Sequence, residues 1–280
     1  MIPRLKDWVW KCVIGFALIT SPALAAPERI VTLGGDITEI VFALGEGEAI
    51  VATDTTSIYP DAAHDIPKLG YVRTLGAEGI VSMKPDLVIA SADAGPDEVI
   101  AKVEAAGVTV LRLEKALDVA GIEHKITAIA DALDEKAEGD ALIGRLRSAM
   151  AAVPAPQEPR PNVLFILSMN GQAVMAAGQG TAAHAAIELA GGHNLFGEFE
   201  GYKAVSPEAL IATQPDAIVI MNNSVERMGG LDPITSHPAL LASPAVKNGH
   251  IAVVDGIALL GFGPRTPAAL KALAEEISAP

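Results

Sequence analysis

The sequence predicts an α/β protein built from two lobes, each with a parallel sheet, joined by a long helical segment. Three observations lead to this prediction. Apolar runs typical of buried strands alternate with helical segments through most of the chain, which is typical of parallel sheets with right-handed crossovers. A short motif occurs twice at an offset of 130 residues. Between the two copies, one long segment has apolar residues at helical spacing and no strand pattern. The expected divisions are a signal peptide over 1–26, an N-terminal lobe over 27–116, a helical spine over 117–153 and a C-terminal lobe over 154–280.

Residues 1–26 have the pattern of a cleavable signal peptide. A basic start is followed by an apolar run from Cys12 to Ile19 and by small residues, Ala23-Leu24-Ala25, at the cleavage site. Removing this segment lowers the basic residues from 20 to 17 and the acidic residues from 34 to 33, which leaves a net charge of −16. So negative a chain is not expected to bind nucleic acid or an anionic membrane surface. Cys12 is the only cysteine, so the mature chain depends on neither disulfides nor thiolates.

The first lobe is expected to open with a strand, a helix and a second strand. Asp36 followed by Glu39 is a capping-box pattern for that helix. The Gly34-Gly35 turn before it invites comparison with a phosphate loop, but the sequence has neither G-x-G-x-x-G nor a P-loop there, so no nucleotide site is predicted. Strands are expected over residues 29–33, 50–53, 87–90 and 108–113, and helices over 36–44, 80–85 and 96–106.

The helical spine is expected to end at the proline-rich stretch 154–161. The alternative is that two ordinary crossover helices lie inside a single sheet. In the second lobe, Ser206 with Pro207 at the next position predicts a capped helix start. Strands are expected over residues 162–167, 217–221 and 250–254, helices over 181–190, from 206 onward and over 264–277, and a loop over 168–171.

The repeated motif predicts that the lobes are two copies of one unit. Glu78 is followed seven and eight residues later by Pro85-Asp86, and Glu208 by Pro215-Asp216; an apolar strand follows each pair. With one gap, Gly70-Tyr71 also matches Gly201-Tyr202. Two such lobes enclose a cleft, where ligands commonly bind. We therefore expect the loops that carry Tyr71 and Tyr202 to face each other across it.

Tyr71 is a candidate metal ligand, because Arg73 is two residues away on the same predicted loop. A nearby guanidinium favours the phenolate form of a phenol. A phenolate is a hard oxygen donor that suits Fe(III), and tyrosine is a known axial ligand of haem iron. The alternative is a half-buried tyrosine that packs its ring and leaves its hydroxyl in water.

The segment Gly70-Tyr71-Val72-Arg73, continued by Ala77-Glu78-Gly79-Ile80 and Lys84-Pro85-Asp86-Leu87, resembles the periplasmic haem-binding proteins of bacterial haem ABC importers. These belong to a wider cluster that binds cobalamin and ferric siderophores, and the resemblance covers nearly all of residues 27–278. It implies a class III periplasmic binding protein with two Rossmann-like lobes, with haem as the transported ligand. It further implies a periplasmic location and an inner-membrane ABC permease with its ATPase as the partner.

The resemblance also implies roles for individual residues. Tyr71 would be the axial ligand of the haem iron, and Arg73 would support its phenolate. Glu78 and Glu208 would dock with arginines of the permease. An arginine of the second lobe commonly approaches the haem in this family, and Arg227 is the candidate here.

Two further residues are ligand-binding candidates. Some members carry a histidine in the loop after the first strand of the second lobe, where this chain has Met169; it would be a weak thioether ligand or a soft apolar contact. Tyr202 would touch the ligand from the second lobe. The Gly-Tyr-x-Arg segment favours haem, while a ferric-siderophore or cobalamin carrier of the same fold is the alternative.

Each candidate also has an ordinary explanation. Glu78 and Glu208 complement a helix dipole wherever they occur in a first turn, and Arg227 could pair with Glu226 or Asp232. The histidines form no pair with zinc-ligand spacing. An enzyme is not expected, because Ser168, Ser206 and His184 are accompanied by no Gly-x-Ser-x-Gly motif.

Overall fold

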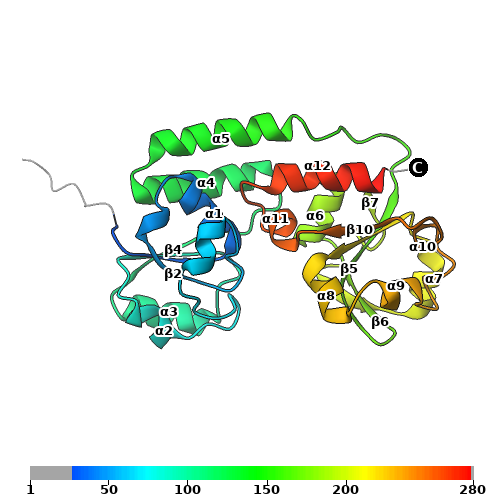
Figure 1. Cartoon of the computed structure of the whole chain (residues 1–280), viewed down its shortest axis with the longest axis horizontal. Coiled ribbons are helices and arrows are strands. Elements are labelled where there is room, and N and C mark those ends of the chain that lie inside the picture. Colours follow the sequence, from blue (N-terminus) through cyan, green and yellow to red (C-terminus); the bar gives the residue numbers. More distant parts are fainter. Residues whose placement is uncertain (1–26, 279–280) are drawn as a thin grey trace, which may run out of the picture.

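The computed structural model describes residues 27–278, which form two α/β lobes side by side beneath a layer of long helices (Figure 1). The signal peptide predicted over residues 1–26 lies outside the described residues. Within residues 27–278, no helix has both the length and the apolar character that crossing a membrane requires.

The N-terminal lobe is a four-stranded parallel sheet with helices on both faces. Its elements are β1 (Ile30–Leu33), α1 (Gly35–Ala43), the 3-10 helix η1 (Gly47–Ala49), β2 (Ile50–Thr53), the 3-10 helix η2 (Asp61–Asp65), α2 (Ala77–Ser82), β3 (Leu87–Ala90), α3 (Asp97–Ala105) and β4 (Thr109–Arg112). The strands pair in the order β2-β1-β3-β4, all in parallel, as predicted. Since side chains alternate between the faces of a strand, Val31 and Val88 pack toward α2 and α3, whereas Ile30 and Leu87 pack toward α1.

The predicted helical spine forms two antiparallel helices, α4 (Val119–Leu133) and α5 (Lys136–Met150) (Figure 1). Asp134 ends α4 in the left-handed conformation, with φ of 60°, which Asp tolerates better than most residues. Gly139 has a specific role in this hairpin. A Cβ at this position would lie 2.6 Å from the Cβ of Ala130, so glycine is what permits the two helices to approach so closely.

The C-terminal lobe has a mixed sheet, which corrects the prediction of two parallel sheets. Its elements are β5 (Asn162–Asn170), β6 (Ala173–Ala177), α6 (Ala182–Leu189), β7 (His193–Asn194), β8 (Tyr202–Val205), α7 (Pro207–Thr213), β9 (Ala217–Met221), α8 (Asn222–Met228), α9 (Asp232–Thr235), α10 (Pro244–Asn248), β10 (Ile251–Val254), α11 (Gly256–Leu260) and α12 (Thr266–Ile277). The order is β10-β9-β5-β6-β8, with β7 beside the start of β5. Strands β9 and β10 are parallel to β5, whereas β6 and β8 continue the sheet in antiparallel fashion.

A tight turn explains the antiparallel part. Gly171 has φ of 59°, which lets β5 return directly as β6 without the long crossover that a parallel neighbour needs. Residues 168–170, predicted as part of a loop, are therefore the end of β5.

The repeated Pro-Asp pairs have the same structural role in both lobes. The carboxylate of Asp86 accepts hydrogen bonds from the backbone N–H groups of Glu28 and Arg29 at 3.1 and 3.0 Å, at the start of β1. The carboxylate of Asp216 accepts one from the N–H of Asn162 at 2.8 Å, at the start of β5. In each lobe the aspartate thus fixes the beginning of the central strand against its neighbour.

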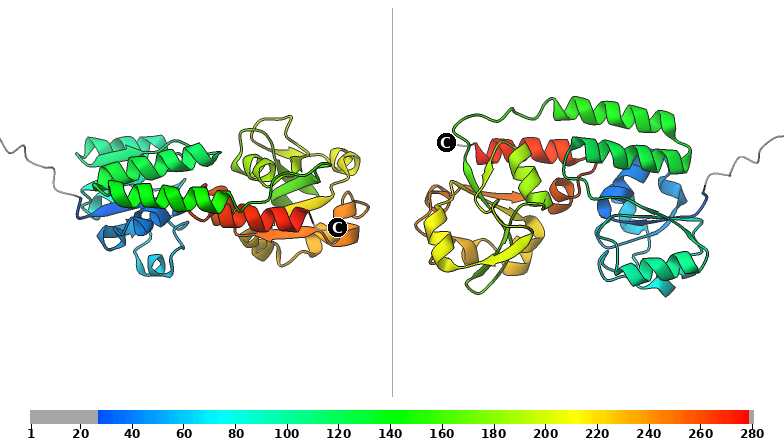
Figure 2. Two further views of the ribbon diagram at one scale, coloured as in Figure 1. Left: turned by 90° about the horizontal axis from the view of Figure 1, so that it is seen from above. Right: turned by 180° about the vertical axis from the view of Figure 1, so that it is seen from behind.

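One hydrophobic cluster under the helix layer contains residues of both lobes. In Figures 1 and 2, α4 and α12 follow one another along the long axis with α5 beside both. Phe262, from the loop before α12, is fully buried in the cluster that also contains Ile37 of α1 and Ile126 of α4. Phe262 has φ of 50°, which is unusual for a bulky residue, so its complete burial is what holds it there.

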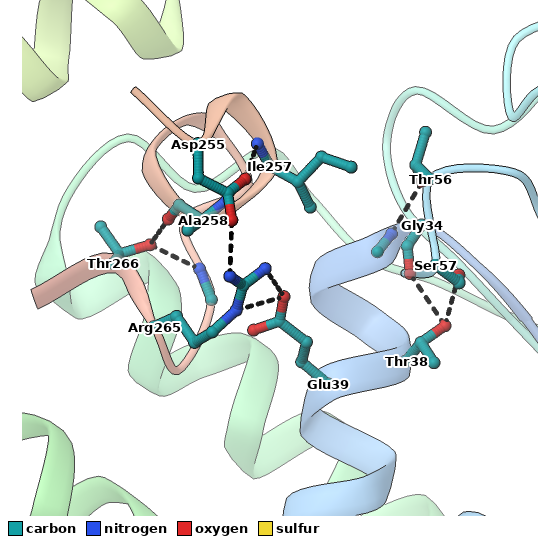
Figure 3. Close-up of polar contacts among 12 residues, drawn as sticks. Gly34, Thr38, Glu39, Thr56, Ser57, Asp255, Ile257, Ala258, Arg265 and Thr266 are labelled. Atoms are coloured by element: carbon teal, nitrogen blue, oxygen red, sulfur yellow. Dashed lines mark hydrogen bonds and ion pairs between the residues drawn. The ribbon is translucent and has the colours of Figure 1, made fainter. Parts of the chain in front are cut away.

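Ion pairs beside this core join α1 to the second lobe and to the spine, and they correct the predicted capping box. Helix α1 begins after Gly34 without any side-chain cap. Glu39 instead accepts hydrogen bonds from Arg265 at 2.7 and 3.0 Å, and Arg265 also donates to Asp255 at 2.7 Å (Figure 3). Asp36 pairs with Lys125 of α4 at 2.5 Å. Both carboxylates of the supposed capping box therefore serve tertiary contacts.

Candidate functional site

Four of the predicted site residues, Tyr71, Arg73, Tyr202 and Arg227, line one cleft between the lobes. Its volume is about 580 Å³, within the range typical of small-molecule sites. A larger hollow of about 710 Å³ lies between residues 154–161 and the end of α12, but none of the predicted site residues lines it. Chemistry rather than size therefore identifies the interlobe cleft as the candidate site.

Tyr71 is an exposed phenol on a well-anchored backbone. It lies in the loop before α2, and the residue is 44 % exposed. Gly70 turns the chain just before it, with φ of 108°. The next residues are fixed, because Val72 and Leu75 are buried and their backbones exchange hydrogen bonds of 2.9 Å with Gly95. The backbone therefore holds the phenol facing the cleft.

Arg73 links Tyr71 to a carboxylate that the sequence did not reveal. Its Nη1 donates to the Tyr71 hydroxyl oxygen at 3.1 Å, and its Nη2 donates to Oδ2 of Asp93 at 2.8 Å. Burial lowers the pKa of Arg73, but the charges and hydrogen bonds of Asp93 and Tyr71 outweigh it and raise that pKa overall. The guanidinium thus stays charged beside the phenol oxygen.

Tyr202 reaches the cleft from strand β8. The sequence analysis had predicted that it lies on a loop. Burial raises the pKa of the Tyr202 phenol, although hydrogen bonds with the backbone of Ala183 and the side chain of Thr181 lower it in part. Tyr202 therefore favours the neutral phenol. The charges of Arg73 and Asp93 also act on it, and both residues line the same cleft as Tyr202.

Two other candidates are placed differently from their predictions. Arg227 lies on helix α8 rather than in a loop, and its Nη2 donates to Oγ of Ser224 at 3.1 Å. Met169 does not line the cleft; it lies opposite Val174 in the β5–β6 hairpin and packs against the apolar cluster there. Met221, at the end of β9, is the methionine that lines the cleft.

Two lysines of the cleft escaped the sequence analysis. Lys125 is 4 % exposed and binds both Asp36 and the carbonyl oxygen of Gly261, the latter at 2.9 Å. A signal for it did exist, because Lys125 interrupts the apolar face of α4. Lys115 donates across the cleft to the carbonyl oxygen of Gly180 at 2.9 Å, and no local pattern marks it.

Comparison with known proteins agrees with this architecture. The model of a periplasmic binding protein family matches residues 30–258. The chain belongs to this family.

Solved structures and curated sequences place this periplasmic binding protein within the haem, B12 and siderophore type. It is similar to the periplasmic heme-binding protein BhuT, solved with two hemes, at 41 % identity and a TM-score of 0.84 over 89 % of this chain and 97 % of that chain. It is also similar to the heme-binding protein RhuT from Roseiflexus sp. RS-1, at 37 % identity and a TM-score of 0.83 over the same shares. The vitamin B12-binding protein of Vibrio vulnificus is 26 % identical over 272 residues, covering 96 % of this chain and 97 % of that protein.

The two glutamates of the repeat lie on exposed first turns of this binding protein, in α2 and α7. Helix α2 lies at the end of its lobe and α7 on the outer side of the other, both away from α5 (Figure 1). Hydrogen bonds from its own backbone N–H and from Ser206 lower the pKa of Glu208, so its carboxylate stays ionised.

Two of the three residues considered for a hydrolase have other partners in this binding protein. Oγ of Ser206 caps α7 by accepting from the N–H of Ala209, and Nδ1 of His184 lies 3.1 Å from Nδ2 of Asn194. Ser168 lines the cleft.

Proposed function

We propose that this protein captures ferric haem in the interlobe cleft, with the phenol oxygen of Tyr71 as the ligand of the iron. The observation that carries the proposal is the position of that oxygen, in the cleft and 3.1 Å from Nη1 of Arg73. A guanidinium hydrogen-bonded to a phenol stabilises the phenolate, and phenolate is an oxygen donor that Fe(III) accepts.

The remaining lining of the cleft suits a large amphipathic ring. Arg73 and Arg227 supply positive charge, and Tyr202 supplies an aromatic face from the opposite lobe. Apolar contact surface is contributed by Leu167, Ala182, Met221, Ile257 and Leu260. Several of the similar solved structures are, by their names, heme-binding proteins, which also supports haem over the other ligands of the family.

A titration of the mature protein with ferric haem tests the proposal. We expect a spectrum typical of tyrosinate ligation. Tyr71→Phe keeps the ring and removes the donor oxygen, so it should abolish that spectrum and weaken binding by about tenfold or more, equivalent to about 1.4 kcal/mol. Tyr202→Phe is the matched control and should keep the spectrum. An unchanged spectrum in Tyr71→Phe would rule out this ligand assignment.

Cobalamin is the second candidate, because curated relatives of similar length bind vitamin B12. The same titration, run in parallel with cobalamin and a hydroxamate siderophore, decides between the ligands. Saturation with cobalamin but not with haem would replace the first proposal with the second.

We also infer that the loaded protein delivers its ligand to an inner-membrane ABC permease with its ATPase. Glu78 and Glu208 would contact basic residues of that permease. Their equivalent places in the two repeats and their exposure on separate lobes support this docking role.

A further inference from the structure

The cleft holds four cations in an otherwise acidic protein, and they differ in how they are neutralised. Arg73 forms an ion pair with Asp93 at 2.8 Å, and Lys125 forms one with Asp36 at 2.5 Å. Among the described residues, Lys115 and Arg227 have no carboxylate partner; each donates to a neutral oxygen, of Gly180 and Ser224 respectively. Two of the four cations that line the cleft are therefore without a direct ion pair to a described carboxylate.

These two cations come from opposite sides of the cleft. Lys115 follows β4 at the end of the first lobe, whereas Arg227 lies on α8 of the second. An ammonium group has three N–H donors and a guanidinium has five. Each residue uses one of them in the contact above, so both retain donors for a ligand.

We propose that Lys115 and Arg227 each bind one carboxylate of the ligand, and that they make the cleft selective for a dianionic tetrapyrrole over a neutral one. This inference rests on the proposed function for the ring itself, since haem carries two propionates. It adds a means by which the cleft distinguishes haem, which has two carboxylates, from a corrin, whose side chains are amides. A charged hydrogen bond to a carboxylate is stronger than one to an amide, which is the source of the selectivity.

Glu114 weakens the attraction of the cleft for a ligand carboxylate. It also lines the cleft, it is exposed, and it stands next to Lys115 in the chain. Its carboxylate reduces the positive potential that a ligand carboxylate meets, so its removal should act in the direction opposite to the removal of Lys115.

The test compares the binding of two ligands to variants of the full mature chain. Wild type, Lys115→Gln and Arg227→Gln are titrated with haemin and with haemin dimethyl ester, which has the same ring and iron but no free carboxylate. We expect each substitution to weaken haemin binding by about tenfold and ester binding by less than about twofold. Lys203→Gln makes the same charge change beside Tyr202 but outside the cleft lining, and it should affect both ligands equally. Glu114→Gln should strengthen haemin binding relative to the ester.

Equal effects of Lys115→Gln on haemin and on its ester would overturn the inference, as would equal effects of Lys115→Gln and Lys203→Gln. Repeating the comparison with metal-free protoporphyrin and its dimethyl ester separates this inference from the iron-ligand proposal. A carboxylate preference that persists without iron supports Lys115 and Arg227 even if Tyr71 proves not to bind the metal. A loss of preference in the metal-free pair would count against them.

Discussion

Arg73 is held between a carboxylate and a phenol. This arrangement fixes the position of the Arg73 side chain more than it stabilises the fold. The Arg73 and Asp93 side chains are 56 % and 53 % exposed, and ion pairs so exposed contribute little to folding. What Asp93 does is restrict a long side chain to the rotamer in which Nη1 reaches the Tyr71 oxygen. Asp93 is thus a positioning residue for the iron ligand that we propose.

Substitutions of Asp93 separate position from charge. Asp93→Asn keeps an oxygen that accepts from Nη2 of Arg73, whereas Asp93→Ala removes it. We expect haem dissociation from Asp93→Ala to accelerate about fivefold, equivalent to the roughly 1 kcal/mol at the upper end for an exposed pair. Dissociation from Asp93→Asn should stay within about twofold of wild type, measured by transfer of haem to a scavenger protein. Equal acceleration in both variants would mean that the charge of Asp93, and not its hold on Arg73, is what matters.

Those residues of the cleft that lie in a local pattern could be predicted from the sequence. Tyr71 and Arg73 stand two apart in one loop, and their relation can be read directly. Asp93 and Lys115 cannot be found in this way, because their partners Arg73 and Gly180 are brought to them only by the assembled sheet and the facing lobe. Met169 was misplaced for a related reason: the hairpin after β5 turns it toward an apolar cluster instead of the cleft.

At the scale of elements, buried parallel strands were predictable and the antiparallel hairpin was not. β1 and β3 are buried throughout and are apolar in sequence apart from Thr32 of β1. β6 is rich in alanine and β8 is largely exposed, so neither has a strong strand pattern. The capping box predicted at the start of α1 was wrong for another reason. Asp36 and Glu39 have capping-box spacing but form ion pairs with Lys125 and Arg265.

The ion pair between Glu39 of α1 and Arg265, which directly precedes α12, links the stability of the molecule to pH. Glu39 is buried, and burial raises its pKa, which the hydrogen bond and charge of Arg265 lower only in part. Removing Arg265 leaves a buried carboxylate without its cation. Its pKa must then rise further, so the folded state takes up a proton more readily than the unfolded state as the pH falls.

We therefore expect Arg265→Met to destabilise the fold by about 3 kcal/mol at about pH 7.5, with part of this loss recovered near pH 5. Urea unfolding at both pH values measures it. Arg145→Met is the matched control, because Arg145 is an exposed arginine of α5 that lines the same hollow as Arg265. A loss in Arg265→Met that is the same at both pH values would contradict the role given to Glu39.

At the scale of the whole molecule, the shared core gives the two lobes a defined relative position. Arg265 and Phe262 reach from the second lobe into the first, and α5 packs beside both α4 and α12. The helices that carry Glu78 and Glu208 are therefore presented at a set separation. This is what a partner with two matching basic sites requires.

Reversal of both charges tests the proposed docking. Glu78→Lys combined with Glu208→Lys should leave haem binding unchanged and abolish stimulation of the permease ATPase in proteoliposomes, because two attractive contacts become repulsive. Asp140→Lys combined with Glu276→Lys changes the same amount of charge on exposed positions of α5 and α12 and should leave stimulation intact. Full stimulation by the first pair would exclude the docking role.

The burial of Phe262 has a consequence for how the chain acquires its shape. The core of the first lobe contains a residue that follows the last strand of the second lobe, β10, in the chain. During synthesis that lobe stays incomplete until the strands of the second lobe have been translated. A chimera that exchanges one lobe for that of a relative must therefore carry the segment around position 262 along with the lobe it completes.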